Sequence, residues 1–414
     1  MSAVWDLPDF DEHEGVHLIC DPQSGLKAVI AIHSTKLGPA AGGVRFWHYA
    51  DSAAAVTDAL RLSRGMSFKN AMAGLPLGGG KGVVLAPAQG ATISEAQLLA
   101  FGDAVESLGG RYVTAEDVGM SEDRMKIIAT RTSHVSGLPV EGGEAGGDPG
   151  PFTALGIYLG VRAAAKRALG ADSMAGVHVA VQGVGSVGGG LARRLAADGA
   201  KLTLADVNAD KAAALAKELG ADVVAADAIL RIPADIVSPN ALGAILTEES
   251  IAALDTKVVA GGANNQLATR ADGDRIHARG ILYAPDYVIN AGGIINVGLE
   301  YLGKGDRAEV EARIARIPDR LNEVWEESAR SGAPASEVAD TIAKRLIGRG
   351  CPDLARTPGS DARQTRSVPL RTTTPLPESS GSGVSRRRRR LRRPIFTPCS
   401  IAIDPLSSRP DAPR

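Results

Sequence analysis

Apolar positions in the first third of the chain follow strand-like and helical spacing in turn. Runs of strand-forming residues at 17–20 and 27–33 are separated by a Pro-Gln-Ser-Gly turn, which predicts two strands joined by a tight connection. Helical spacing predicts a helix over 53–64 that continues toward Lys69, and the glycines at 78–80 are expected to break it. Further expected elements are strands at 44–49, 83–85 and 112–114 and a helix at 94–108. This pattern indicates one α/β domain.

From about residue 152 the pattern becomes a regular alternation of helices and strands. A helix is expected at 154–169, and the strands that follow are expected at 177–182, 201–205, 235–237, 257–260 and 281–284. Such alternation implies parallel pairing with right-handed crossovers, hence a doubly wound sheet. A last helical stretch, 308–346, is broken near 332–334. We therefore expect an α/β protein of two domains, an N-terminal α/β domain (1–145) that the helices of 308–350 join, and a doubly wound domain (146–307).

The segment 351–414 differs in composition from the rest of the chain. It holds 10 of the 23 prolines, 13 arginines, no lysine and 5 acidic residues, a net charge of +8, whereas the remainder carries −9. We expect a disordered Arg/Pro-rich tail. Arginine without lysine is what out-of-frame translation of GC-rich DNA produces, so a frameshift product or a lineage-specific extension is our interpretation. The alternative is a tether to nucleic acid or another anionic surface through 386–393.

The cysteines, Cys20, Cys351 and Cys399, are far apart in the sequence and form no CxxC pair. We therefore expect neither a disulfide framework nor a metal site, as in a reducing cytosol. The chain begins with no basic-then-apolar leader, and no apolar run has the length of a membrane span. These features predict a cytoplasmic protein without a membrane partner.

A glycine fingerprint lies between the strand at 177–182 and the following helix. Its residues are Gly183, Val184, Gly185, Ser186, Val187 and Gly188. The first glycine permits a tight turn, the second lets backbone approach a pyrophosphate, and the third lets helix and strand pack closely. Asp206 ends the next strand, where a carboxylate can bind a ribose 2′-hydroxyl and would repel a 2′-phosphate. The motif predicts NAD rather than NADP; the alternative is a glycine-rich turn with no ligand.

Two lysines and one aspartate are candidates for acid–base chemistry. Lys81 follows the glycines at 78–80, where bare backbone can approach a substrate, and Lys69 lies near a helix end. Desolvation or a second cation would lower the pKa of such a lysine and provide a base. Asp117, just past a strand, could share the proton transfers of a hydride-transfer reaction. In the alternative interpretation, both lysines are ordinary solvated surface residues, and the acidic pair Glu116-Asp117 only caps a helix that begins near Ser121.

Taken together, these motifs resemble the glutamate/leucine/phenylalanine/valine dehydrogenase family, most closely its leucine dehydrogenase branch. The matching segments, in the family's order, are 38–43, 66–70, 77–81, 114–119, 183–188, 261–265 and 284–293. The resemblance implies an N-terminal substrate and oligomerisation domain followed by a Rossmann NAD-binding domain. The family's chains end soon after the last predicted helix, so the tail departs from the pattern.

The resemblance also implies roles for the candidate residues. Lys69 would hold the substrate α-carboxylate, with the backbone of Gly42 and Gly43 lining the same pocket. Lys81 would activate the water that attacks the imino acid, and Asp117 would handle the proton of the substrate amino group. These assignments predict oxidative deamination of an L-amino acid to a 2-oxo acid and ammonia, and its reverse.

The cofactor side and the assembly follow by the same resemblance. Asn264 or Asn265 would contact the nicotinamide, and Thr153 would lie near its carboxamide. The family is typically homo-oligomeric, assembled through the first domain, so a homo-oligomer is expected. Nucleic acid is expected as a partner only through the tail.

The residues that would line the substrate side-chain pocket by this resemblance are Ala41, Ala115, Ile294 and Val297. All four are apolar, which argues against glutamate and favours a branched-chain or other apolar amino acid, as in leucine dehydrogenase. One methylene is worth only about 1–3 kcal/mol in such a pocket, so leucine, valine and isoleucine stay open. Ala41 is small where leucine enzymes tend to have a larger residue, so a phenylalanine preference stays open too. A catalytically silent nucleotide-binding relative is the alternative from another functional class.

Overall fold

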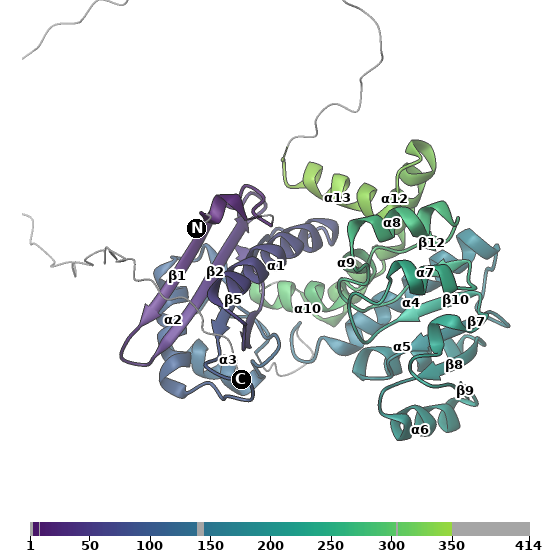
Figure 1. Ribbon diagram of the computed structural model, residues 1–414, viewed down its shortest axis with the longest axis horizontal. Coiled ribbons are helices and arrows are strands. Elements are labelled where there is room, and N and C mark those ends of the chain that lie inside the picture. Colours follow the sequence, from purple (N-terminus) through teal and green to yellow (C-terminus); the bar gives the residue numbers. More distant parts are fainter. Residues whose placement is uncertain (1–2, 8, 139–144, 304, 350–414) are drawn as a thin grey trace, which may run out of the picture. The chain divides into compact units, whose positions relative to one another are not determined.

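The computed structural model describes residues 3–7, 9–138, 145–303 and 305–349. Within them the chain forms two six-stranded sheets, each with its own helices (Figure 1). The tail at 351–414, with Cys351 and Cys399, lies outside the described residues, so the expectations for it stay predictions. None of the described helices combines the length and the apolar character needed to cross a bilayer.

The N-terminal sheet has the order β1-β2-β5-β3-β6, with β4 paired to β5. Its strands are β1 (Gly15–Asp21), β2 (Leu26–Ser34), β3 (Ala40–Ala41), β4 (Val44–Trp47), β5 (Gly78–Leu85) and β6 (Tyr112–Val113). The predicted pair of strands at the start is an antiparallel hairpin, and Gly25 at its turn has a φ of +74°. Almost every residue of β2 and β5 is buried, as expected for central strands covered on both faces.

Three helices cover this sheet; the periodicity predicted the first two, and the third follows Ser121, where the alternative interpretation of the acidic pair placed a helix. They are α1 (Ser52–Met72), α2 (Glu95–Ser107) and α3 (Glu122–Ala129), preceded by the short helix η1 (Val4–Asp6). The Asp51 side chain caps α1 by accepting a hydrogen bond from the Ala54 N–H. The helix packs on β5 and β2 and carries Lys69 in its last turn, as predicted.

The prediction for the glycines at 78–80 was wrong in one respect. Helix α1 ends earlier, at Met72, and the three glycines form the start of β5. A Cβ on Gly78 would lie 1.9 Å from the Ser34 oxygen, and one on Gly79 would lie 2.0 Å from the Ser67 nitrogen. The glycines are therefore needed because β5 passes against bare backbone of β2 and α1.

The second sheet has the order β12-β11-β10-β7-β8-β9, and every pair is parallel. Its strands are β7 (His178–Gln182), β8 (Lys201–Ala205), β9 (Asp222–Val223), β10 (Ile236–Pro239), β11 (Val258–Val259) and β12 (Leu282–Tyr283). In chain order this is 3-2-1-4-5-6, the Rossmann arrangement, which confirms the predicted fold class. Only the short, exposed β9 was not predicted.

The helices of this sheet alternate with its strands. They are α4 (Gly150–Leu169), α5 (Ser186–Ala197), α6 (Ala209–Leu219), η2 (Ile229–Arg231), α7 (Glu248–Ala253) and α8 (Arg270–Ala278). The strand order reverses between β7 and β10, and ligands of open α/β sheets bind at such a switch point. The glycine fingerprint follows β7 and therefore lies at this point.

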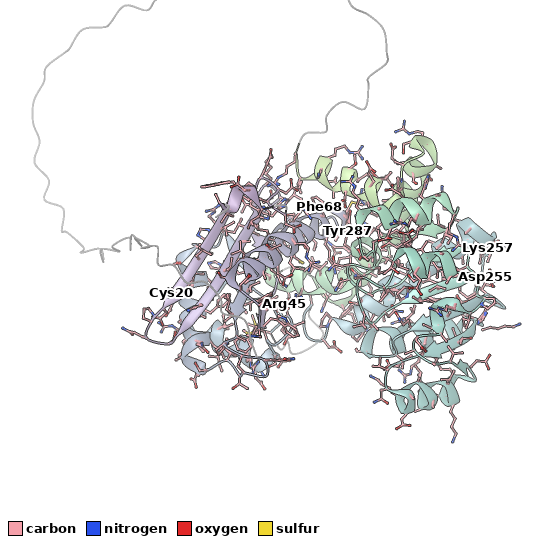
Figure 2. The ribbon with its side chains drawn as sticks, in the orientation of Figure 1. Cys20, Arg45, Phe68, Asp255, Lys257 and Tyr287 are labelled. Atoms are coloured by element: carbon pink, nitrogen blue, oxygen red, sulfur yellow. The ribbon has the colours of Figure 1, made fainter. Side chains whose placement is uncertain are left out.

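The chain then returns toward the N-terminal sheet through five helices. They are α9 (Asp286–Ile289), α10 (Gly292–Tyr301), α11 (Arg307–Ile314), α12 (Ile317–Ser331) and α13 (Ala335–Leu346). The predicted break near 332–334 is present, and a second one at 315–316 was missed. Helix α12 begins after it, with Pro318 in its first turn, where proline is well tolerated. Helix α12 packs on α4, while α13 packs on α1. Figure 2 labels Phe68 of α1 and Tyr287 of α9, whose rings lie 6.4 Å apart between the two sheets.

Candidate active site

A cavity of about 490 Å³ is lined by residues from both sheets. It collects every residue predicted for catalysis or substrate binding, and those residues are Ala41, Gly42, Gly43, Lys69, Lys81, Ala115, Asp117, Ile294 and Val297. Four of the residues predicted for the cofactor line it as well: Thr153, Val187, Asn264 and Asn265. The structure thus brings together residues that are up to 256 positions apart in the sequence.

The two glycines at the base of this cavity are required by packing. A Cβ on Gly42 would lie 1.9 Å from the Gly80 oxygen, and one on Gly43 would lie 2.4 Å from the Glu116 oxygen. Side chains at these positions would therefore push apart the strands that carry Lys81 and Asp117.

Lys81 and Asp117 form a buried ion pair in the cavity wall. Lys81 on β5 is only 6% exposed, and its Nζ donates to Oδ2 of Asp117, which follows β6. The same oxygen accepts a hydrogen bond from Arg45 Nε on β4, at 3.2 Å. Arg45 was not predicted: a charged residue in an alternating strand reads as solvent-exposed, and its partner is 72 positions away.

The burial of this pair moves both pKa values away from their ordinary ranges. The pKa of the Lys81 ammonium is lowered: burial is the largest cause, Asp117 opposes it, and Arg45 lowers the pKa further. For Asp117, burial alone would raise the pKa, but the charges of Lys81 and Arg45 outweigh it, so the pKa is lowered. The aspartate is therefore an anion, and the lysine is easier to deprotonate than a surface lysine.

Lys69 extends from the last turn of α1 into the same cavity. Burial, reinforced by the charge of Lys81, lowers the pKa of Lys69 to about 8 in spite of the opposing effect of Asp286. Asp286 begins α9 and accepts hydrogen bonds from the backbone N–H groups of Gln266 (3.0 Å) and Tyr287 (2.6 Å). Asp286 lies inside the segment 284–293 that resembles the family, but no role was predicted for it.

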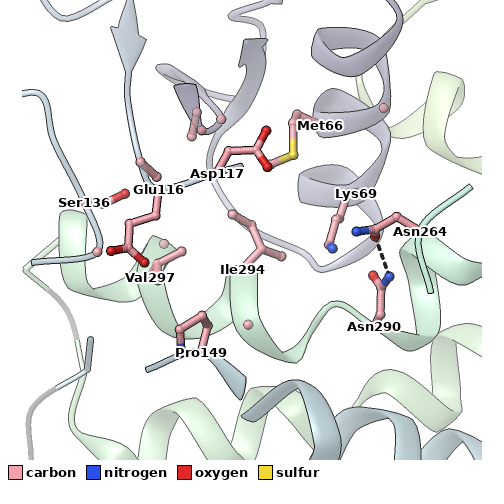
Figure 3. A pocket seen from close by; sticks show the side chains of 18 of the residues that line it. Met66, Lys69, Glu116, Asp117, Ser136, Pro149, Asn264, Asn290, Ile294 and Val297 are labelled. Carbon is pink, nitrogen blue, oxygen red and sulfur yellow. Dashed lines mark hydrogen bonds between the residues drawn. The ribbon is translucent and has the colours of Figure 1, made fainter. Parts of the chain in front are cut away.

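The two ends of the cavity differ in character, as Figure 3 shows. Lys69, Asn264 and Asn290 lie at one end, and Val297 lies at the other with Glu116 and Ser136. Further apolar lining residues that were not predicted are Leu77 and Val113. Ser136 and Glu116 were assigned no role in the cavity, although Glu116 lies in the matching segment 114–119.

Glu116 places a carboxyl group near the apolar end of the cavity. Burial, together with Glu122, Asp148 and Glu300, raises its pKa. The cationic residues among the described lining are Arg45, Lys69 and Lys81. Lys69 lies at the other end of the cavity from Glu116 in Figure 3, and the ion pairs of Arg45 and Lys81 are with Asp58 and Asp117. That end of the cavity therefore suits an uncharged side chain.

Asn290, another residue that was not assigned a role, holds the amide of Asn264. Its Nδ2 donates to Asn264 Oδ1 at 2.7 Å and to the Gly262 oxygen at 3.0 Å (Figure 3). This contact uses the oxygen of the Asn264 amide and leaves its NH₂ group to donate into the cavity. The neighbouring Asn265 has a φ of +51°, an uncommon conformation that turns the backbone here.

The glycine fingerprint has the geometry that its spacing predicted. Gly183 has a φ of +83°, and a Cβ on Gly188 would lie 1.9 Å from the Gly183 oxygen, so strand and helix are in close contact. A Cβ on Gly185 would meet nothing within 4 Å, so the approach to the start of α5 is open. No side chain caps this helix, whose first N–H groups remain available for an anion.

The other residues that were predicted to bind the cofactor do not line the cavity that contains Lys81 and Asp117. Val184, Gly185 and Ser186 instead line a separate hollow with Arg193 and Lys211. Asp206 follows β8, as predicted, and its carboxylate accepts the backbone N–H groups of Val184 (2.8 Å) and Asn208 (2.9 Å). The Asp206 carboxylate therefore lies beside the glycine turn and holds its backbone in place. Across the described residues, no three His, Cys, Asp or Glu side chains are grouped to hold a metal ion.

Comparisons with known proteins agree with this architecture. The Glu/Leu/Phe/Val dehydrogenase dimerisation domain matches residues 14–134, and the Glutamate/Leucine/Phenylalanine/Valine dehydrogenase model matches residues 204–346. The chain is 46% identical to leucine dehydrogenase of Thermoactinomyces intermedius over 83% of this chain and 93% of that one. It is also 46% identical to valine dehydrogenase of Streptomyces albus, over 81% and 92%.

A solved structure extends the similarity to three dimensions. The L-tryptophan dehydrogenase of Nostoc punctiforme has a TM-score of 0.73 and 38% identity, covering 81% of this chain and 96% of that one. The resemblance inferred from the motifs is thereby confirmed. The chain belongs to the glutamate/leucine/phenylalanine/valine dehydrogenase family and is an amino acid dehydrogenase, an oxidoreductase that acts on a CH–NH₂ group.

Proposed function

We propose that the protein catalyses the reversible NAD-dependent oxidative deamination of a branched-chain or other apolar L-amino acid to the 2-oxo acid and ammonia. The observation that carries this proposal is the buried Lys81–Asp117 pair, which lies beside Lys69 in a cavity with an apolar far end. In this proposal Lys69 binds the substrate α-carboxylate by a charge-assisted hydrogen bond. The NH₂ group of Asn264 is a second donor on the same side of the cavity.

The acid–base steps are assigned to the ion pair. Asp117, held ionised by two cations, accepts a proton from the substrate ammonium. NAD, when bound, accepts the α-hydrogen as a hydride, which leaves an imino acid. Lys81, whose pKa burial lowers, then takes a proton from water as the oxygen attacks the imino carbon. Lys81 returns that proton to the nitrogen, and as ammonia leaves, Lys81 takes the hydroxyl proton while the carbonyl of the 2-oxo acid forms.

The residues of the second sheet fit a nicotinamide dinucleotide. A positive φ at Gly183, open space at Gly185 and close contact at Gly188 form the turn that a pyrophosphate needs. The Asp206 carboxylate beside that turn can accept a ribose 2′-hydroxyl and would repel a 2′-phosphate, which favours NAD over NADP. Thr153, Val187 and Asn265 line the cavity on this side and would contact the nicotinamide end.

Substrate choice is assigned to the apolar end of the cavity. Ala41, Ala115, Ile294 and Val297 would contact the substrate side chain there. A glutamate side chain would bring its carboxylate toward Glu116 and away from the cations of the lining, so we expect glutamate to be a poor substrate. The small Ala41 favours a second candidate, a phenylalanine-preferring enzyme, because it leaves room for a ring.

We also propose that the protein is a homo-oligomer that associates through its N-terminal sheet. That sheet lies within the matched dimerisation domain, and its edge strand β1 exposes Leu18. Light scattering coupled to size-exclusion chromatography would measure the assembly; a monomer at micromolar concentration would contradict the proposal.

The decisive experiment is the rate of NAD and NADP reduction with L-Leu, L-Val, L-Ile, L-Phe, L-Ala and L-Glu. We expect activity with the apolar substrates and NAD, loss of that activity in Lys81→Ala, and normal activity in Lys27→Ala, which removes an exposed lysine of β2. Activity confined to L-Phe would select the second candidate. If no amino acid reduces either cofactor above the Lys81→Ala background, the proposed function is wrong.

A further inference from the structure

Arg45 connects the catalytic pair to a second, inert carboxylate. Its Nε donates to Asp117 Oδ2 at 3.2 Å, and its Nη1 donates to Asp58 Oδ2 at 3.0 Å. Asp58, on α1, accepts two more hydrogen bonds, from the Tyr49 hydroxyl at 2.7 Å and from Arg61 Nη2 at 3.0 Å. Figure 2 labels Arg45 on the N-terminal sheet, and the guanidinium is fixed at both ends by these contacts.

The two cations that bond to Asp117, Lys81 and Arg45, have different roles in the proposed reaction. The proposed function requires Lys81 to lose and regain a proton during each turnover. While Lys81 is neutral, it provides no positive charge to keep Asp117 ionised. An arginine does not lose its proton in the range where enzymes work. Arg45 is therefore the one of the two whose charge stays constant through the cycle.

The hydrogen bonds also distinguish the two oxygens of the Asp117 carboxylate. Both Lys81 and Arg45 bond to Oδ2. Oδ1 forms neither of these ion pairs, and in this inference it receives the proton from the substrate. Because Asp58 anchors Arg45 and Arg45 anchors Oδ2, the orientation of the carboxylate is set from α1 and β4, outside the reacting groups.

Resting on the proposed function, we propose that Arg45 is a positioning residue of this enzyme: a permanent counter-charge, anchored on Asp58, that keeps Asp117 ionised and oriented while the Lys81 proton comes and goes. It acts through Asp117 and Lys81 and does not itself exchange protons.

The groups that could titrate around the pair are few. Among the described residues, the charged or titratable side chains that interact with this pair are Arg45 on β4, Asp58 and Lys69 on α1, and Tyr112 on β6. Tyr49, after β4, interacts with Arg45 and Asp58. Burial raises the pKa of both tyrosines, so they stay neutral in an ordinary assay. The positive charge of Arg45 lowers the pKa of Asp117 and also that of Lys81, so its removal raises both.

The test compares Arg45→Met, which removes the charge, with Arg45→Lys, which keeps it. For Arg45→Met we expect kcat/KM at pH 7 to fall about 10- to 100-fold, a share of what acid–base groups contribute, and both limbs of the pH profile to move to higher pH. Arg45→Lys should keep the limbs in place with a smaller loss. Arg131→Met, which breaks the exposed Arg131–Asp103 pair (2.8 Å) far from the cavity, is the matched control and should behave as wild type.

A second readout does not depend on turnover. The acetylation rate of Lys81 against pH, followed by mass spectrometry on the free protein, reports its neutral fraction. Its midpoint should move to higher pH in Arg45→Met and stay in Arg45→Lys, with thermal unfolding used to verify that both variants are folded. Unmoved limbs and an unmoved midpoint in folded Arg45→Met would overturn the inference. The wild-type and Lys81→Ala assays decide the proposed function separately, whatever the Arg45 variants do.

Discussion

Arg349, the last described residue, fastens the end of the chain to the N-terminal sheet. Its guanidinium donates to the backbone oxygens of Asp11 (2.5 Å), Glu12 (2.8 Å) and His33 (2.6 Å) and to His33 Nε2 (2.6 Å). Burial lowers the pKa of His33, so its ring is neutral and Nε2 can accept. A chain that ends at Gly350 keeps all these contacts, whereas a chain that ends at Gly348 loses them.

The expected loss can be estimated from these bonds. Hydrogen bonds to a charged group contribute about 1.5–3 kcal/mol each, but most of these acceptors can be hydrated once Arg349 is gone, so we expect about 3 kcal/mol in total. Unfolding entropy for about 350 residues, the part of the chain up to Gly350, is about 0.7 kcal/mol/K, which converts that loss into a Tm lower by about 4 °C.

The assay is thermal unfolding of three proteins: the chain cut after Gly350, the chain cut after Gly348, and full-length Arg349→Ala. The first should keep the Tm and the specific activity of the full chain, and the other two should share a lower Tm. Equal Tm values for the two truncated chains would refute the stabilising role of the Arg349 contacts. A large loss of activity on removal of 351–414 alone would show that the tail is not dispensable.

Two further predictions concern the cavity, and a third concerns the glycine fingerprint. Because the pKa of Lys69 is lowered to about 8, the ammonium that binds the substrate carboxylate is lost as pH rises through 8, so KM for the amino acid should increase above that pH; a KM flat to pH 9.5 would contradict this role. Ala41→Leu fills the apolar end and should lower kcat/KM for L-Phe relative to L-Val about tenfold, measured as the ratio of the two; an unchanged ratio would place the ring elsewhere. A Cβ on Gly188 would lie 1.9 Å from a backbone oxygen. Overpacking of this kind costs about 1–3 kcal/mol, so Gly188→Ala should lower the free energy of unfolding by that amount and should therefore lower the Tm. Gly185→Ala meets open space and should leave Tm unchanged while weakening NAD binding in calorimetry; the reverse pattern would be inconsistent with the fingerprint geometry.

Much of the fold could be predicted because its elements are locally encoded. The strands β7 and β8 lie within a residue of their expected positions, and helix α1 begins one residue before its expected start. The glycines at 78–80 were misplaced because glycine weakens strands in general. Here the reason for glycine is the backbone of Ser34 and Ser67 on neighbouring elements, and that contact is not visible in the local sequence.

The candidate site divides in the same way. Lys81 and Asp117 could be found because each lies in a distinctive local motif. Arg45 and Asn290 could not, because what makes them important is a contact with a residue 72 or 26 positions away. Motifs therefore identify the groups that react, whereas the groups that orient them emerge only when the chain is folded.

The segment that carries α9 and α10 explains why the cavity needs both sheets. Asp286, at its start, acts on Lys69 of the N-terminal domain, and Asn290, one turn later, fixes the Asn264 amide of the second sheet. Ile294 and Val297, in the next turns, line the apolar end of the cavity. One continuous stretch of backbone thus touches the carboxylate end, the cofactor side and the side-chain end. A substrate side chain that displaces α10 would therefore also disturb the alignment of Lys69 and Asn264. The fit of the side chain thus affects the groups that position the reacting carbon.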